Sequence, residues 1–152
     1  MNKKALFLSL AFPLLIGGIS AFLTKDQMDL YSHLNQPKIS PPGYFFPIIW
    51  TILFILMGIS SYIIYMSKSP QRENALVIYA FQLFINFCWP LFFFNLQNYF
   101  MALMVLIVLL ILIIIMLLRF YSIKPLACYL NIPYALWVSF ALYLNFYIFI
   151  NN

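Results

Sequence analysis

Five apolar segments, each 19 to 25 residues long, constrain this chain more than any other feature of its sequence. They cover residues 5–23, 44–66, 75–96, 99–118 and 126–150. The hydrocarbon core of a bilayer is about 30 Å thick, and about 20 helical residues cross it. Barrel strands would be shorter and would alternate polar and apolar residues, which these segments do not. We therefore expect an all-α integral membrane protein, a five-transmembrane-helix bundle that forms a single membrane domain over residues 1–152.

The charge content excludes most other classes of protein. Only 7% of the 152 residues are charged, whereas about a quarter are charged in a typical soluble domain. So few charges cannot cover the surface of a cytosolic enzyme. The net charge of +5 does not indicate nucleic-acid binding either, because the basic residues lie at or beyond the ends of the apolar segments. Cys88 and Cys128 lie in or close to apolar segments and are interpreted as buried small hydrophobic residues rather than as a disulfide framework.

Lysine and arginine are distributed unevenly between the two sides that five spans create. One side carries Lys3, Lys4, Lys68, Arg72, Arg119 and Lys124, and the other carries only Lys25 and Lys38. Basic residues favour the cytoplasmic side of a membrane. We therefore predict a multi-pass protein, in the cell membrane if the source is bacterial, with a cytoplasmic N-terminus. The loop from Thr24 to Gly43 would then face away from the cytoplasm.

This first loop is the longest connection in the chain. It contains His33, which is the only histidine, two of the three acidic residues and three prolines. A loop of this length in a small protein is often functional, for example as a lid over a site. The alternative is a plain tether between two spans, and the sequence leaves both open.

Polar and aromatic residues recur at steps of three or four within four of the five segments. Two interpretations compete for the buried amides Gln82, Asn86 and Asn145. They either form hydrogen bonds between helices, or they orient a flat apolar ligand in a cavity lined by Trp and Phe. The stretch 101–118 has no polar residue, which indicates a scaffold helix that faces lipid or a partner helix.

Several kinds of chemistry are excluded by the residues present. One histidine and three acidic residues, all outside the apolar segments, provide no metal site, no pair of catalytic carboxylates and no catalytic triad. No charged residue lies in the middle of a span, which argues against an ion-coupled transporter. We expect no metal and no required cofactor.

Three stretches of the sequence resemble the translocator protein family, TspO/MBR. This family includes the bacterial tryptophan-rich sensory proteins and the peripheral-type benzodiazepine receptor. The first stretch is PKISPPGYFFPIIWTILF, from Pro37 to Phe54. The second runs from Gln82 to Phe93 and the third from Pro133 to Asn145, in the order expected for the third and fifth helices of the family. The resemblance covers almost the whole chain.

The resemblance implies a five-helix bundle, usually a homodimer in the lipid bilayer, with a pocket closed by the first loop. Family members bind porphyrins, haem and synthetic aromatic ligands, and some degrade porphyrin in light. Carried over residue by residue, the ligand-binding set is Tyr31, Pro41, Trp50, Phe54, Asn86, Trp89, Pro90, Trp137 and Ala141. Trp50 and Trp137 are the candidate catalytic residues if the protein oxidises porphyrin. The expected function is a receptor or sensor for tetrapyrroles, and the alternative is a passive translocator or assembly partner without chemistry.

Overall fold

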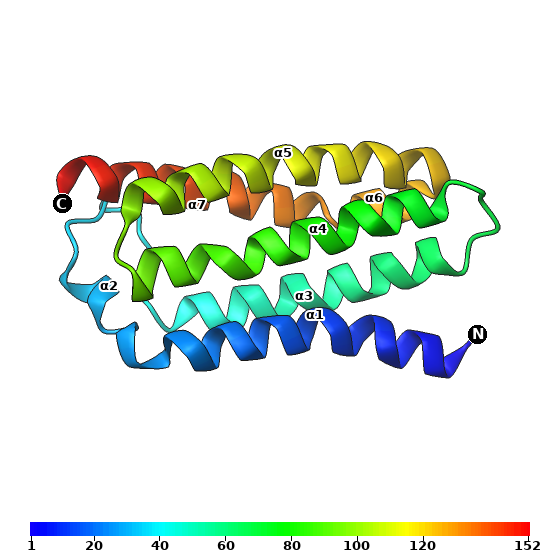
Figure 1. Cartoon of the computed structure of the whole chain (residues 1–152), viewed down its shortest axis with the longest axis horizontal. Helices are drawn as coiled ribbons and strands as arrows, with labels where there is room; N and C mark the ends of the chain where they lie inside the picture. The colour runs from blue at the N-terminus through cyan, green and yellow to red at the C-terminus, as the bar shows by residue number, and fades with distance from the viewer.

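The computed structural model describes residues 1–152 and confirms the five-helix membrane architecture. Five helical segments are long and apolar enough to cross a bilayer, and they run side by side along the long axis of the molecule (Figure 1). The long helices are α1 (Lys3–Thr24), α3 (Phe45–Tyr65), α4 (Arg72–Pro90), α5 (Tyr99–Ile123) and α7 (Ile132–Asn151). The chain is therefore an integral multi-pass membrane protein.

Helix α1 lies at the edge of the bundle and packs mainly against α3. Its N-terminus is capped by Asn2, whose Oδ1 accepts a hydrogen bond from the Ala5 N–H at 3.0 Å. Gly58 of α3 lets the two backbones approach closely, because a Cβ at this position would lie 2.8 Å from the Ser9 carbonyl oxygen and 2.9 Å from the Leu10 Cα. Small residues commonly have this role where membrane helices cross.

Helices α4 and α5 form a tight antiparallel hairpin, because only residues 96–98 separate the two helical segments. Pro90 has no N–H to donate within α4, and the helix continues as one π-helical turn, η2 (Leu91–Asn95). The chain then reverses over three residues, with Gln97 in the left-handed region at φ 51°. One face of α5 is buried against α4 and α7, and the opposite face is exposed.

The last predicted span is not one continuous helix. The chain forms α6 (Pro125–Tyr129), leaves helical structure at residues 130–131 and resumes as α7. Pro133 cannot donate to the Tyr129 carbonyl, which removes one hydrogen bond at this point. The Asn131 side chain fills the interruption, because its Nδ2 donates to the Ser60 Oγ at 2.6 Å and to the Ala127 carbonyl at 3.0 Å. A buried polar contact thus joins α6 to α3.

The first loop folds over one end of the bundle through two short elements, η1 (Lys25–Gln27) and α2 (Leu30–His33). Tyr31 is the buried anchor of this loop, and its hydroxyl donates to the Pro41 carbonyl at 3.0 Å. Burial raises the pKa of the Tyr31 phenol above its usual value, an effect that the neighbouring Ser40 hydroxyl partly offsets. The phenol is therefore a neutral hydrogen-bond donor at physiological pH.

The loop is also fastened to the end of α7 by three hydrogen bonds, which we call the asparagine clamp. The Asn35 N–H donates to the Asn152 Oδ1 at 3.1 Å, and the Asn152 Nδ2 donates back to the Asn35 carbonyl at 3.0 Å. The Asn35 Nδ2 also donates to the Asn151 carbonyl at 3.0 Å. These contacts hold the loop in place over the bundle.

Candidate functional site

A cavity of about 410 Å³ lies between α1, α3, α4 and α7, at the end of the bundle that the first loop covers. This volume falls within the range of about 300–1,000 Å³ found for small-molecule pockets. Helix α5 contributes no residue to the lining, as a scaffold role predicts. The aromatic residues that line the cavity are Tyr31, Phe46, Trp50, Phe54, Phe87, Trp89, Phe93 and Phe94.

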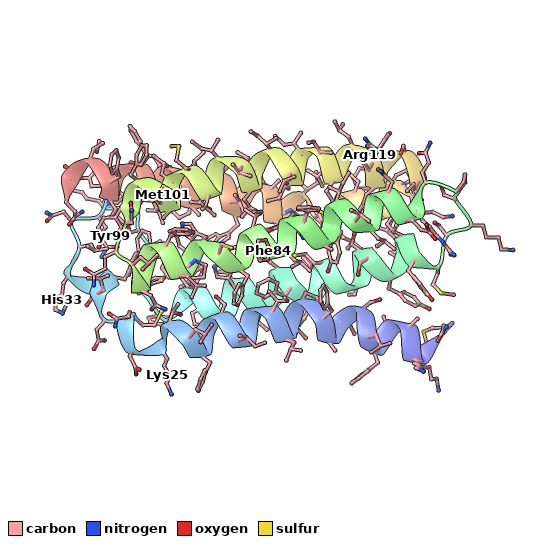
Figure 2. The ribbon with its side chains drawn as sticks, in the orientation of Figure 1. Lys25, His33, Phe84, Tyr99, Met101 and Arg119 are labelled. Atoms are coloured by element: carbon pink, nitrogen blue, oxygen red, sulfur yellow. The ribbon has the colours of Figure 1, made fainter.

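Lys25 is the single charged residue among those that line the cavity. Its side chain extends away from the bundle (Figure 2), and its Nζ lies 4.3 Å from the centroid of the Phe22 ring. The ammonium group is therefore outside the cavity, and no acidic side chain lines the interior. The site is electrostatically neutral and strongly apolar.

Most of the ligand-binding residues inferred from the sequence surround this cavity. The structure places Tyr31, Trp50, Phe54, Asn86, Trp89, Pro90 and Ala141 on its lining. Pro41 is not on the lining but supports it, because its carbonyl accepts the hydrogen bond from Tyr31. Contact of each residue with a ligand remains a prediction.

Trp137 is the other inferred residue that lies outside the lining. Its ring packs against Phe46 at a centroid distance of 5.7 Å, and Phe46 itself lines the cavity. Trp137 therefore stands one layer behind the wall. Its indole N–H is enclosed by protein and has no hydrogen-bond partner.

The wall formed by α3 is a pair of stacked rings. Trp50 and Phe54, one helical turn apart, have ring centroids 5.6 Å apart and an interplanar angle of 29°. Gly17 of α1 makes room for them, since a Cβ at this position would collide with the Phe54 ring. The pair presents an aromatic surface on which a flat ligand can stack.

A chain of buried hydrogen bonds leads from the cavity into the bundle. The Asn86 Nδ2 donates to the Tyr134 hydroxyl at 2.7 Å, and that hydroxyl donates to the Gln82 Oε1 at 2.6 Å. Tyr134 and Gln82 are 1% and 0% exposed, so neither group has water as an alternative partner. The chain joins α4 to α7 and fixes the orientation of the Asn86 amide.

Asn145 forms a second polar junction beside the cavity. Its Oδ1 accepts from the Trp89 Nε1 at 2.9 Å, and its Nδ2 donates to the Tyr99 carbonyl at 2.9 Å. The two interpretations of the buried amides are thus compatible. All three bond to groups on other helices, and two of them, Asn86 and Asn145, also line the cavity.

Sequence reasoning missed part of the lining. Phe46, Phe87 and Phe94, the lining residues of α1 between Leu14 and Thr24, and Lys25 were not assigned to the site. Phe46 lies four residues before Trp50, so helical spacing alone could have identified it. Gly17, Ser20 and Thr24, which follow one another at steps of three or four along the first span, also line the cavity.

Comparisons with known proteins place the sequence in a family. The sequence model of the TspO/MBR family matches residues 9–150. The tryptophan-rich protein TspO of Chlorobaculum tepidum is 36% identical, with 96% of each chain covered. The tryptophan-rich protein TspO of Archaeoglobus fulgidus is 33% identical over 100% of this chain and 99% of its own. The translocator protein of Sus scrofa is 33% identical, and the match covers 80% of this chain and 74% of that protein.

Proposed function

Because the chain belongs to the TspO/MBR family, we propose that it is a membrane receptor or sensor that binds porphyrins and other flat aromatic ligands. The observation that carries this proposal is the ring-lined cavity between α1, α3, α4 and α7, which the first loop covers. The resemblance further supports a homodimer in the bilayer, a state that cross-linking in membranes tests directly.

The chemistry of the cavity suits a tetrapyrrole. The flat faces of a macrocycle gain from stacking on indole and phenyl rings, which Trp50, Phe54 and Trp89 offer on two facing helices. A neutral apolar interior favours a large aromatic body over a sugar or a nucleotide. The porphyrin or haem is a ligand in this proposal, not a cofactor that the fold requires.

Binding is tested by titrating purified protein in detergent with protoporphyrin in darkness, following the porphyrin absorbance and the quenching of tryptophan fluorescence. Ala141 lines the cavity, so Ala141→Phe should fill it and weaken binding at least tenfold. Ala80 is exposed on α4, so Ala80→Phe introduces the same ring outside the cavity and should bind like the wild type. Wild-type protein without saturable binding, or equal binding by both variants, would contradict the proposal.

Passive translocation is the alternative function, and three of the relatives are named translocator protein. Protein reconstituted into liposomes separates the two functions. A receptor or sensor binds porphyrin without accelerating its equilibration across the bilayer. Porphyrin flux that depends on the protein and disappears in Ala141→Phe would support translocation instead.

A further inference from the structure

Five serine and threonine side chains are buried in this protein, and the hydroxyl of one of them differs from the rest. They are Ser20, Thr24, Ser60, Ser61 and Ser67. Four of the five donate to a backbone carbonyl at 2.7 to 2.9 Å, or 3.0 Å for Ser61. The hydroxyl of Ser20 donates to none. Ser20 lines the cavity, and its hydroxyl oxygen remains accessible.

An unbonded hydroxyl at this position needs a physical reason. Serine inside a helix commonly donates to the carbonyl three or four residues earlier, because an unpaired O–H in apolar surroundings is unfavourable. Thr24, one turn further along α1, does so by donating to the Ser20 carbonyl at 2.9 Å. The Ser20 hydroxyl instead faces the cavity with its bonding capacity unused.

Most other polar groups on the lining are already engaged. The hydroxyl of Thr51 donates to the Pro47 carbonyl at 2.7 Å, and those of Tyr31 and Thr24 donate within the protein. The indole N–H of Trp89 is bonded to an amide. Apart from Ser20, open capacity remains on Asn86, which uses one amide hydrogen towards Tyr134.

We propose that Ser20 is a specificity-determining residue, whose hydroxyl donates a hydrogen bond to a carbonyl or carboxylate oxygen on the rim of a flat aromatic ligand. This inference rests on the proposed function, because it concerns the same cavity. The absence of acidic side chains from the lining means that an anionic oxygen meets no repulsion there. The site therefore favours porphyrins that carry oxygen over porphyrins with alkyl substituents alone.

The experiment compares two porphyrins and two serine-to-alanine substitutions. Protoporphyrin IX carries two carboxylates, and etioporphyrin has the same macrocycle with alkyl substituents only. Ser20→Ala removes the unbonded hydroxyl, and the matched control Ser139→Ala removes an exposed hydroxyl outside the cavity, which donates to the Ala135 carbonyl at 2.8 Å. Loss of one hydrogen bond predicts about threefold to tenfold weaker binding of protoporphyrin IX by Ser20→Ala. We expect etioporphyrin affinity to be unchanged in Ser20→Ala, which also shows that the cavity is intact.

Each alternative outcome has a distinct meaning. Unchanged protoporphyrin affinity in Ser20→Ala, an equal loss for both porphyrins, or an equal loss in Ser139→Ala would overturn the role of Ser20 while leaving porphyrin binding in place. Wild-type protein that binds neither porphyrin would contradict the proposed function and the role of Ser20 together.

Discussion

At the scale of single residues, the hydroxyl of Tyr134 is the group on which the largest buried polar chain depends. It accepts from Asn86 and donates to Gln82. Tyr134→Phe keeps the ring but leaves both amide groups without this partner, so we predict a loss of about 1–2 kcal/mol in the free energy of unfolding. Thermal unfolding in detergent measures this loss. Tyr143→Phe is the matched control, because Tyr143 lies on the same helix with 45% of its surface exposed. Equal melting temperatures for the two variants would show that the buried hydrogen bonds of Tyr134 contribute nothing to stability.

The tryptophans allow binding to be separated from chemistry. We predict that Trp50→Phe and Trp137→Phe keep most porphyrin affinity, with a change of about 1 kcal/mol. Phenylalanine preserves much of the apolar contact of Trp50, and Trp137 lies behind the wall of the cavity. If either indole transfers an electron, light-dependent porphyrin degradation should fall sharply in that variant, since a phenyl ring is much harder to oxidise. Absorbance of bound porphyrin under illumination measures the rate. Wild-type rates in both variants would leave a binding protein without enzymatic activity.

Sequence reasoning at this scale identified side chains well but not the direction in which each one points. Trp137 and Ala141 are one turn apart and share a stripe, yet only Ala141 reaches the cavity. Spacing shows which residues share a helix face. It does not show how far that face is turned towards a neighbour, and here Phe46 of α3 occupies the space in front of the indole.

At the scale of helices, the contact between α1 and α3 depends on a missing side chain. We predict that Gly58→Ala lowers the free energy of unfolding by about 1–3 kcal/mol, because its Cβ would meet the backbone of α1 below 3 Å and force the helices apart. Gly18→Ala on α1 is the control, since a Cβ there meets no atom within 4 Å. Denaturation of both variants in detergent tests the pair, and a destabilised Gly18→Ala with an unaffected Gly58→Ala would contradict the close contact.

The helices themselves were largely predictable from hydropathy, and the exceptions have local causes. The interruption before α7 occurs where Asn131 and Pro133 fall close together, and a long hydropathy window averages over both residues. The four-residue helix α2 is held by contacts distant in sequence, such as the bond from Tyr31 to Pro41. Elements that depend on tertiary contacts leave little signal in the local sequence.

At the scale of the whole molecule, the basic residues are separated towards opposite ends of the bundle. The N-terminus and the α3–α4 connection lie together at one end, with Arg119 towards the same end, whereas Lys25 and the first loop lie at the other (Figures 1 and 2). We predict that the first loop faces away from the cytoplasm. In a background without Cys88 and Cys128, Ser32→Cys should react with an impermeant thiol reagent in intact cells.

The opposite end of the bundle provides the control for this orientation. Gln71 is exposed in the α3–α4 connection, so Gln71→Cys should be labelled only after the cells are lysed. The reverse pattern would show an inverted protein, and labelling of both positions in intact cells would show a mixed orientation.

We expect the asparagine clamp to affect the rate of ligand exchange rather than the affinity. Its bonds lie at the exposed end of the bundle, and Asn35, Asn151 and Asn152 do not line the cavity. Asn152→Ala removes two of the three bonds, so we predict faster porphyrin association and dissociation in stopped-flow traces, with an equilibrium constant within about twofold of the wild type. An exchange rate equal to that of the wild type would show that the loop does not limit exchange. A protein that releases its ligand slowly stays occupied after the free ligand concentration has fallen. The lifetime of this occupied state would be set by three hydrogen bonds at the surface.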